Sequence, residues 1–404
     1  MKPLQVMVIA GETSGDMLAA ELVKELERQV MAGPPGTVAE GKPGSRQPAP
    51  SFFGAGGPRM AAAGVELAVD MTRHSIIGLT EALKKLVQFY RIFRQLRSLA
   101  FERSPEVILC VDFSGFNRRF AHAIRQSVRA GKARSPGWNP RLVQYVSPQV
   151  WASREGRAQK MAADYDLLLA IFPFEKAWYA QRVPKFAVEF VGHPLLDRYA
   201  HLGSRAKAAP ERSPTNQMLT LLPGSRPGEL RRHLPVMLAA LTEIHECAPT
   251  LQAQMVLPSD ELVSIAQGMS PSPFLKVRRG GLPEALMQST LAMASTGTVT
   301  MECAFFGVPT VALYKTSWST YQVGKRIVKV KYLAMPNILA DEPLFPEFIQ
   351  NEATAANLAT ATLKLLKDEP RRLRIRARLA EIVATLGGPG ASERASKAVL
   401  NLLK

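Results

Sequence analysis

Short apolar runs alternate with longer amphipathic stretches along most of this chain, and a polar or Gly-rich turn separates the members of each pair. The run Gln5–Ala10 precedes the amphipathic stretch Leu18–Val30, and Glu106–Val111 precedes Phe120–Ala130. Buried parallel strands are near-continuous apolar runs, and helices usually connect them. The alternation therefore predicts βα units on a parallel sheet rather than a β sandwich. Further strands are predicted at Leu142–Val146, Leu167–Phe172 and Val188–Val191.

The alternation restarts after a stretch rich in Pro and Ser, Leu202–Gln217. The strands predicted in this second series are Met218–Leu222, Ala253–Leu257, Leu291–Ser295 and Thr310–Leu313. Two α/β domains are the natural division of such a chain. Ligands of these sheets bind at the carboxyl ends of the strands, so a cleft between the two domains is the expected site. The predicted boundaries are 1–202 and 218–354 for the domains, 203–217 for a linker, 355–404 for C-terminal helices and 32–51 for a flexible insertion.

The composition excludes several classes of protein. The chain has 404 residues, of which 47% are hydrophobic and only 3 are Cys. Such a chain can bury sizeable cores, so disorder is excluded, and a disulfide scaffold or a Cys-rich zinc module is excluded as well. No stretch approaches the ~20 apolar residues of a membrane span, and the first apolar run is too short for a signal peptide. A cytoplasmic protein is expected.

The chain is strongly basic, with a formal net charge of +17. Nucleic acid, an anionic membrane surface and an acidic substrate are the partners that such a charge attracts. A general basic drift of the proteome is the alternative that needs no partner. Aromatic residues make up 7% of the chain and do not interleave with basic ones, so no nucleic-acid partner is expected.

Three strand ends of the first domain carry candidate residues. The turn Gly11–Asp16 allows close backbone approach at a helix start, with Ser14 or Asp16 as the helix cap. Asp112 follows an apolar strand, where catalytic bases lie in parallel sheets; a helix cap is the alternative. The turn Tyr145–Trp151 is typical of the floor of a sugar or lipid pocket, and equally of an ordinary buried turn.

The second domain carries two patterns typical of phosphate binding. Pro223–Glu229 is a Gly/Ser turn with one arginine, which suits a diphosphate through backbone amides and a bidentate cation. Ala294–Thr298 leads from a strand into a helix, whose N-terminus favours phosphate oxygens, and Glu302 could accept hydrogen bonds from ribose hydroxyls. Together they predict a nucleotide-sugar site without a metal. The residues expected at the nucleotide are Gly224, Ser225, Arg226, Thr296, Gly297, Thr298 and Glu302.

Residues 76–97 combine apolar residues at helical spacing with a basic margin. An amphipathic helix packed on the domain has this pattern, and so does a patch lying on an anionic bilayer. The residues that would face such a bilayer are Ile76, Ile77, Leu79, Leu83 and Leu86.

A metal site is not expected. Asp164 and Asp166 match a D-x-D pattern, but they precede a predicted strand instead of following one. The 6 His are scattered along the chain, and no other group of acids or His has the spacing of metal ligands.

The chain resembles the lipid-A-disaccharide synthase family, glycosyltransferases of the GT-B fold, through strings that occur in order along nearly its whole length. They are AGETSGD (10–16), GAGGPRMAAAG (54–64), VDFSGFN (111–117), YVSPQVWA (145–152), PFEKAWY (173–179), VGHPL (191–195), LLPGSR (221–226), STGTVTMECAFFGVP (295–309) and MPNILAD (335–341).

The resemblance implies an inverting, cofactor-free transfer of 2,3-diacylglucosamine from UDP to the 6-hydroxyl of 2,3-diacylglucosamine 1-phosphate, at the cytoplasmic face of the inner membrane. By motif, Asp112 becomes the general base, while Arg226, Thr298 and Glu302 join Asn337 at the donor. The helices at 355–404 are expected to cross back onto the first domain, or onto a neighbouring subunit in a homodimer. The residues assigned to the acceptor side of the cleft are Glu12, Ser14, Ser147 and Trp151.

Two enzymes of the same architecture remain as alternatives. A nucleotide-sugar 2-epimerase would release UDP without an acylated acceptor, and a peptidoglycan N-acetylglucosaminyl transferase would need a lipid-pyrophosphate acceptor. A basic nucleic-acid-binding protein, from a different class, would show steeply salt-dependent binding.

Overall fold

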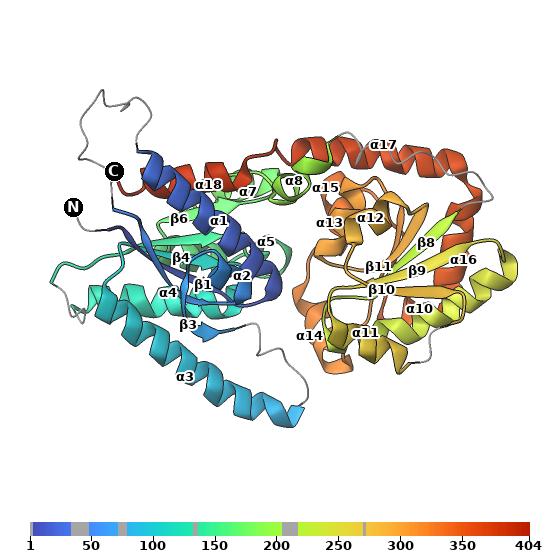
Figure 1. The fold of residues 1–404 in the computed structure, drawn as a ribbon, viewed down its shortest axis with the longest axis horizontal. Coiled ribbons are helices and arrows are strands. Elements are labelled where there is room, and N and C mark those ends of the chain that lie inside the picture. The colour runs from blue at the N-terminus through green and yellow to red at the C-terminus, as the bar shows by residue number, and fades with distance from the viewer. Residues whose placement is uncertain (1–2, 34–47, 72–78, 132–135, 204–216, 270–271) are drawn as a thin grey trace. The chain divides into compact units, whose positions relative to one another are not determined.

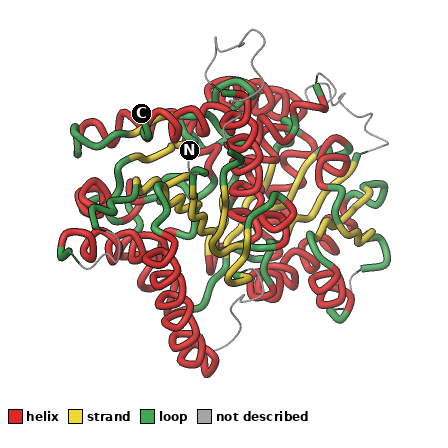
Figure 2. The backbone as a smooth tube through the Cα atoms, turned by 60° about the vertical axis from the view of Figure 1, so that its left-hand side comes forward, coloured by secondary structure: helices red, strands yellow, loops and turns green. Residues whose placement is uncertain are grey.

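The structure is a computed structural model that describes residues 3–33, 48–71, 79–131, 136–203, 217–269 and 272–404 (Figure 1). The chain forms two compact units. The N-terminal unit comprises Met1–Arg198 together with Leu386–Lys404, and the C-terminal unit comprises Tyr199–Thr385. Each is an α/β unit in which strands alternate with helices, as the tube drawing shows (Figure 2).

The N-terminal unit contains a seven-stranded sheet in the order β3-β2-β1-β4-β5-β6-β7. Its neighbouring strands pair in parallel. Strand order reverses between β1 and β4, which makes the carboxyl edge of these two strands the switch point of the sheet. The strands are β1 (Gln5–Ala10), β2 (Ser51–Gly56), β3 (Glu66–Asp70), β4 (Val107–Val111), β5 (Arg141–Tyr145), β6 (Leu167–Ala170) and β7 (Val188–Phe190).

Helices cover both faces of this sheet, with α1 and α18 on one face and α3 and α4 on the other (Figure 1). Because side chains alternate along a strand, Met7 and Ile9 of β1 point to the same face. There they join a buried cluster with Leu96 of α3 and Phe120 of α4. The helices are α1 (Thr13–Ala32), α2 (Pro58–Ala62), α3 (Leu79–Arg103), α4 (Ser114–Arg129), α5 (Val150–Ser153), α6 (Arg157–Asp164), α7 (Pro173–Arg182), α8 (Leu195–Arg198) and α18 (Ala391–Asn401).

Strands β2 and β3 were not among the predicted strands. The sequence of β2, Ser-Phe-Phe-Gly-Ala-Gly, is rich in glycine and resembles a loop. Gly54 has φ +150°, and a Cβ there would lie 2.0 Å from the Val8 carbonyl oxygen of β1. The strand therefore needs glycine for close backbone approach, and this need cannot be read from periodicity.

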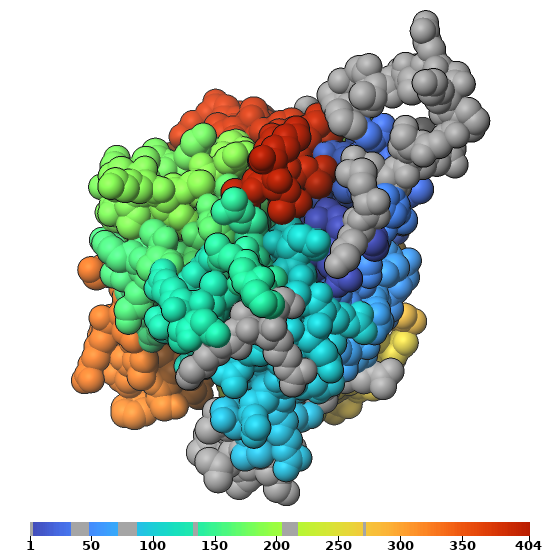
Figure 3. Space-filling model, turned by 90° about the vertical axis from the view of Figure 1, so that its left-hand side faces the viewer, coloured from blue at the N-terminus to red at the C-terminus, as the bar shows by residue number. Residues whose placement is uncertain are grey.

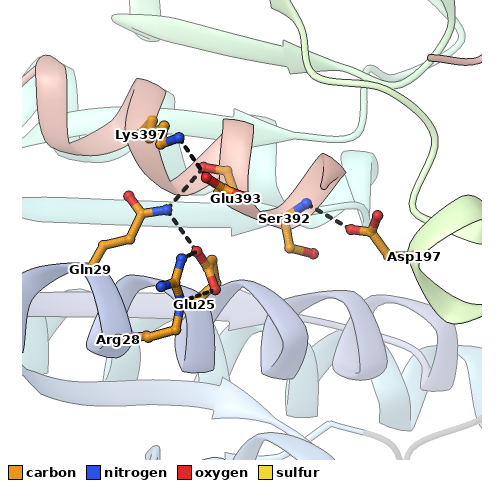
Figure 4. A network of polar contacts seen from close by, with 7 residues as sticks. All are labelled: Glu25, Arg28, Gln29, Asp197, Ser392, Glu393 and Lys397. Carbon is orange, nitrogen blue, oxygen red and sulfur yellow. Dashed lines mark hydrogen bonds and ion pairs between the residues drawn. The ribbon is translucent and has the colours of Figure 1, made fainter. Parts of the chain in front are cut away.

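The last helix of the chain, α18, packs on α1 within the N-terminal unit, so the C-terminal segment crosses back to the first domain (Figure 3). Gln29 of α1 donates a hydrogen bond to the Glu393 carbonyl (3.1 Å), as Figure 4 shows. The Asp197 carboxylate accepts hydrogen bonds from three successive backbone N–H groups at the start of α18, those of Gly390, Ala391 (3.1 Å) and Ser392 (3.0 Å). A carboxylate at a helix N-terminus is stabilising, so Asp197 anchors α18.

The C-terminal unit contains a six-stranded sheet in the order β10-β9-β8-β11-β12-β13, again with parallel pairing. Its switch point lies between β8 and β11. The strands are β8 (Met218–Leu222), β9 (Gln252–Leu257), β10 (Leu275–Arg279), β11 (Leu291–Ser295), β12 (Thr310–Tyr314) and β13 (Glu347–Ile349). The edge strands β10 and β13 were not predicted, because neither is buried enough to form an apolar run.

The helices of this unit follow the strands in alternation. They are η2 (Ala200–Leu202), α10 (Pro227–Cys247), α11 (Asp260–Gln267), α12 (Leu282–Met287), α13 (Thr298–Phe305), α14 (Trp318–Ile327), α15 (Met335–Ala340), η4 (Gln350–Glu352), α16 (Ala355–Lys367) and α17 (Glu369–Thr385). Helix α16 packs on α10, and α17 packs on α13. Of the proposed linker, residues 204–216 lie outside the described residues, as does 34–47 of the proposed insertion.

Candidate active site

Asp112 lies at the switch point of the N-terminal sheet. It directly follows β4, whose neighbour β1 ends at Ala10 and continues into the turn Gly11–Asp16. The two segments adjoin, since a Cβ added to Gly15 would lie 3.6 Å from the Asp112 Cβ. The Asp112 side chain is half-buried. Ligands of open α/β sheets bind at the switch point, so the Asp112 carboxylate lies where it could reach such a ligand.

The backbone around Asp112 is strained. Asp112 has φ +48°, Phe113 has φ +43° and Val146, at the end of β5, has φ +67°. Left-handed φ values are uncommon outside glycine and most unfavourable for a β-branched residue such as valine. Each costs of the order of 1–3 kcal/mol and persists only where the surroundings enforce it.

Two buried amides hold this strained backbone. Asn117 of α4 donates to the Asp112 carbonyl (2.9 Å), and Gln144 of β5 donates to the carbonyls of Asp112 (3.2 Å) and Val146 (3.1 Å). Both side chains are fully buried. The sequence reasoning did not single them out, although a glutamine inside an apolar strand was a usable signal, because a buried amide needs partners.

The Phe113 ring packs directly against the backbone of Gly11. A Cβ on Gly11 would lie 2.1 Å from the Phe113 ring. That ring stacks on Phe116 with a centroid distance of 5.5 Å and an interplanar angle of 22°. The glycine of the first turn therefore makes room for the aromatic residue next to the candidate base.

The turn after β1 differs from expectation in its capping. Glu12 is the N-cap residue of α1 and makes no side-chain cap hydrogen bond; it is exposed, and Ser14 is half-buried. Asp16 does not cap α1 either. Its buried carboxylate accepts from the backbone N–H groups of Gly57 (2.7 Å), Arg59 (3.0 Å) and Met60 (3.0 Å), and so caps α2. Asp16 is the fourth residue of α1, and the N-cap position is occupied by Glu12, which explains the difference.

Ser147 and Trp151 are both buried. The Ser147 hydroxyl lies 3.2 Å from the Tyr179 hydroxyl, and the Trp151 indole donates to Glu175 Oε1 (3.1 Å). In this structure they support the sheet edge from inside instead of forming its surface. Glu175 also accepts from the Phe172 amide (3.1 Å), and burial raises the pKa of its carboxyl to about 7. Glu175 was not among the predicted site residues, although an acid at the third position of a helix is a capping signal.

The candidate nucleotide residues lie at the switch point of the C-terminal sheet, where the ends of β8 and β11 adjoin. Gly224 has φ +128° and Gly297 has φ +134°. Gly297 and Thr298 are exposed, Thr296 is half-buried, and nothing lies within 4 Å of a Cβ added to Gly297. Helix α13 starts at Thr298, so its first N–H groups and positive dipole end lie at an open edge, which favours a phosphate.

Arg226 is exposed and pairs with Glu229 at 2.9 Å. Glu229 also accepts a hydrogen bond from the Ser225 amide (3.2 Å). The Glu229 carboxylate thus engages both the guanidinium and one backbone amide of the candidate nucleotide turn. Glu302, in α13, is half-buried and accepts a hydrogen bond from the Tyr199 hydroxyl (2.9 Å).

His233 is a residue that the sequence reasoning missed. Its Nδ1 lies 2.7 Å from the Pro223 carbonyl oxygen, and its Nε2 accepts from the Lys315 amide (3.0 Å). Burial lowers the pKa of this imidazole, which keeps it in the neutral form that the two hydrogen bonds require. His233 therefore ties the turn Pro223–Glu229 to the residue that follows β12. A histidine within a helical pattern carried no signal for this role.

Asn337 does not face open space, contrary to the expected donor contact. It is fully buried, and its amide nitrogen donates to the Phe345 carbonyl (2.8 Å) and to Glu347 Oε1 (2.7 Å). Its oxygen accepts from the Phe345 amide (2.8 Å). With its hydrogen-bonding groups engaged, Asn337 fixes the segment between α15 and β13.

The remaining expectations concern metals and membranes. Asp164 pairs with His122 (3.0 Å) and Asp166 with Arg125 (2.6 Å). The described residues contain no group of three or more His, Cys, Asp or Glu side chains suited to a metal ion. Among the helices that the structure describes, none has the length and apolar character to span a bilayer. Ile76 and Ile77 lie outside the described residues, and the side chains of Leu79, Leu83 and Leu86 in α3 do as well.

Solved structures of low sequence identity share this fold. They include a glycosyltransferase of kitacinnamycin (TM-score 0.61, 17% identity, 100% of both chains covered) and UDP-GlcNAc 2-epimerase from Neisseria meningitidis, bound to UDP-GlcNAc (TM-score 0.58, 12% identity, 99% of this chain and 100% of that one). These likenesses concern the fold alone: two Rossmann-like parallel-sheet domains of the GT-B type.

Sequence comparisons reach further. A sequence model of the lipid-A-disaccharide synthetase family matches residues 6–402. The lipid-A-disaccharide synthase of Geobacter metallireducens is 37% identical over 99% of this chain and 97% of its own length. That of Chromohalobacter salexigens is 34% identical over the same shares. Because the family model and these relatives match nearly the entire chain, and the fold is of the GT-B type, this chain belongs to the lipid-A-disaccharide synthase family of glycosyltransferases.

Proposed function

We propose that the chain transfers 2,3-diacylglucosamine from its UDP derivative to the 6-hydroxyl of 2,3-diacylglucosamine 1-phosphate, which yields the β-1,6-linked disaccharide 1-phosphate and UDP. Full-length family membership supports this reaction. The observation that carries it is the pairing of chemistries: an acid at the switch point of one sheet, and an open, glycine-rich phosphate edge at the switch point of the other.

Asp112 is the proposed general base. A β-linked product from an α-linked donor requires inversion, so the acceptor oxygen attacks the anomeric carbon as the bond to the diphosphate breaks. The proton of the attacking hydroxyl passes to Asp112, and the electron pair of the broken bond leaves on UDP. Asn117 and Gln144 hold the Asp112 backbone carbonyl, so they are positioning residues for the base. A positioned base contributes about 10²–10⁴-fold to such a step.

The C-terminal unit is proposed to bind the UDP and stabilise it as a leaving group. Charge grows on the diphosphate in the transition state, where preorganised N–H groups and an arginine are most effective. The open amides at Gly297 and Thr298 and the guanidinium of Arg226 supply these donors, with Glu302 assigned to the ribose. When the diphosphate binds, it replaces Glu229 as the ionic partner of Arg226. The arginine therefore keeps an ionic partner before and after binding.

Mass spectrometry of the products tests this proposal and separates it from its alternatives. Purified protein is incubated in detergent micelles with UDP-diacylglucosamine and diacylglucosamine 1-phosphate. Parallel reactions contain UDP-N-acetylglucosamine alone, or UDP-N-acetylglucosamine with a lipid-pyrophosphate acceptor. We expect disaccharide 1-phosphate in the first reaction only. UDP release from UDP-N-acetylglucosamine alone would favour the 2-epimerase, and a product on the lipid pyrophosphate would favour the peptidoglycan transferase.

We further propose that the enzyme acts while bound peripherally to the cytoplasmic face of an anionic membrane, since both substrates carry acyl chains. In α3, Val87 (51% exposed) and Tyr90 (63% exposed) lie beside the exposed Arg91 and Arg94. Apolar side chains with a basic margin are typical of interfacial helices.

Sedimentation with phosphatidylglycerol vesicles tests the membrane proposal. Replacement of Ile76, Ile77 and Leu79 by Ser removes apolar area from the proposed patch and is expected to release the protein into the supernatant. Leu373→Ser, which removes an exposed leucine from α17, is the matched control. Undiminished sedimentation of the triple variant would assign the stretch to the protein core.

A further inference from the structure

Four arginines gather at the carboxyl edge of the N-terminal sheet, and the reaction described above leaves them unused. Arg118 and Arg119 lie in α4, which follows β4, while Arg154 ends the short helix α5 and Arg157 starts α6, both of which follow β5. Strands β4 and β5 are neighbours, and α4 packs on α6. We refer to these four residues as the arginine cluster. It therefore lies at the same sheet edge as Asp112.

The positive charges of the cluster act on one another. Burial lowers the pKa of the Arg157 guanidinium, and the charges of Arg118, Arg154 and Arg119 lower it further. Burial likewise lowers the pKa of Arg118; Arg119 and Arg154 add to the effect, while Tyr165 and Asp164 oppose it. These lowered pKa values indicate that the folded chain holds the four guanidinium groups close enough to repel one another, which costs free energy relative to the unfolded chain.

Opposite charges compensate the cluster only in part, since the Asp164 carboxylate raises the pKa of Arg118 against the effect of burial. In the described part of the chain, none of the four arginines forms an ion pair. The nearby acids are engaged elsewhere, since Asp164 binds His122 (3.0 Å) and Glu155 binds Arg182 (3.5 Å). The Nε of Arg118 is buried and has no hydrogen-bond partner among the described residues. A buried donor without a partner is costly, and it points to a ligand that the folded chain is built to receive.

The chemistry of guanidinium groups indicates the kind of ligand. Their planar forks match the geometry of phosphate oxygens, and two or more can share a dianion through charge-assisted hydrogen bonds. Like charges held together at the expense of stability are typical of functional sites. Arg119 and Arg154 are exposed, so the cluster is open to an anion from solvent.

We propose that the arginine cluster binds a phosphate monoester, the 1-phosphate of the sugar acceptor. This inference rests on the proposed function. Arg118 lies four residues beyond the first residue of α4, a rise of about 6 Å along the helix axis. In the acceptor, C1, which carries the phosphate, and C5, which carries the 6-hydroxymethyl group, flank the ring oxygen, so a sugar that offers its 6-hydroxyl to Asp112 holds its phosphate within about one ring width of that carboxylate. The cluster would therefore orient the acceptor and select the phosphorylated form.

The test compares two acceptors that differ only in the phosphate. The KM values of 2,3-diacylglucosamine 1-phosphate and of the methyl glycoside of 2,3-diacylglucosamine are measured in neutral detergent micelles. For the double variant Arg154→Gln/Arg157→Gln, we expect KM for the phosphorylated acceptor to rise about 10-fold or more, the equivalent of one lost charge-assisted contact. KM for the methyl glycoside and the Kd for UDP should not change.

The matched control is Arg129→Gln/Arg141→Gln. It removes the same charge from the last residue of α4 and the first residue of β5, at the opposite edge of the sheet. This control should leave both KM values unchanged. Thermal unfolding gives a readout that a structural role would not share, since loss of mutual repulsion should keep the Tm of the cluster variant at or above that of the wild type.

Three outcomes would overturn the proposal. An equal rise in KM for both acceptors would show that the cluster shapes the site without reading the phosphate. Loss of binding to phosphatidylglycerol vesicles with unchanged discrimination between the acceptors would assign the cluster to bilayer headgroups. Discrimination lost equally in the control variant would reduce the effect to net charge.

Equilibrium binding of diacylglucosamine 1-phosphate without donor separates this inference from the proposed function. If the wild type binds this lipid through the cluster but forms no disaccharide, the phosphate site stands and the reaction fails. If disaccharide forms and binding does not depend on the cluster, the reaction stands and the phosphate site fails.

Discussion

The two sheets of this protein end in edges of opposite construction. At the C-terminal edge, left-handed backbone occurs at Gly224 and Gly297, where the absence of a side chain makes it inexpensive. At the N-terminal edge it occurs at Asp112, Phe113 and Val146, where it is strained. In the proposed function, the C-terminal edge offers backbone amides to the diphosphate, and the N-terminal edge offers the Asp112 carboxylate to the acceptor.

The chemistry proposed for each edge explains why positive φ values fall on glycine at one edge and on residues with side chains at the other. Phosphate oxygens are bound by backbone N–H groups, so glycine serves and little has to be enforced. A base must carry a side chain, so the same sharp turn has to be held from outside. Asn117 and Gln144 provide that support as buried amides bound to carbonyls. We therefore expect side-chain changes to matter most at the N-terminal edge, and backbone changes at the C-terminal edge.

The largest effect is expected from Asp112→Asn. The amide cannot take the proton of the acceptor hydroxyl, so turnover should fall by about 10²-fold or more. UDP affinity should stay within about twofold, because the nucleotide residues belong to the other unit. Steady-state kinetics and calorimetric UDP titration measure the two quantities. Near-normal turnover would remove Asp112 from the mechanism.

The second prediction concerns the pH dependence of stability, which has opposite signs for one buried group in each unit. Burial raises the pKa of Glu175 to about 7, so the folded N-terminal unit binds a proton more tightly than the unfolded chain between pH 4.5 and about 7. The stability from this group is thus present at low pH and declines as the pH rises through that window, by at most about 3 kcal/mol. The pKa of buried His233 is lowered, so its contribution has the opposite sign and declines as the pH falls below 6.5.

Hydrogen exchange on peptides from α7 and α10 measures these opposite trends in one sample. Glu175→Gln should abolish the loss of protection in α7 at higher pH and leave the trend in α10 unchanged. The same pH trend in α7 of the wild type and the variant would contradict the assignment to Glu175.

A third effect, about 10-fold, is expected from Arg226→Ala. Loss of one charge-assisted contact to the diphosphate should weaken UDP binding, while binding of the lipid acceptor should not change. Arg232→Ala is the control, since Arg232 is an exposed arginine of α10 that contacts the Gly228 carbonyl (2.9 Å). Equal UDP affinity in Arg226→Ala and the wild type would exclude the diphosphate role.

The last contrast, which concerns stability alone, comes from an exchange of residue types between the edges. Gly297→Ala places a side chain at φ +134° and should lower stability by about 1–3 kcal/mol, although space for the Cβ is available. Val146→Gly removes the strain at φ +67° but also loses side-chain burial and adds chain entropy, so its stability should stay within about 1 kcal/mol of the wild type. Urea unfolding of the two variants checks the contrast. Equal destabilisation by both would mean that strain is not partitioned as proposed.

Much of the fold was predictable because burial leaves a local pattern. Strands such as Gln5–Ala10 and Met218–Leu222 are buried on both faces and read as apolar runs. The candidate base and the glycine turns follow these strands directly, so the same pattern located them. Edge strands left no such pattern. Arg279 of β10 is exposed, and the three residues of β13 are only half-buried.

The alternation of apolar and amphipathic segments thus determined by itself that two parallel sheets form and which strand ends carry Asp112, Arg226 and Gly297, because hydrophobic periodicity is a local property. Only the tertiary structure decided what supports them. Asp16 caps α2 instead of its own helix, and Asn117 holds the carbonyl of Asp112. These partners are chosen by which strands become neighbours in the sheet, and hydrogen bonds between segments distant in the chain leave no periodic trace in the sequence.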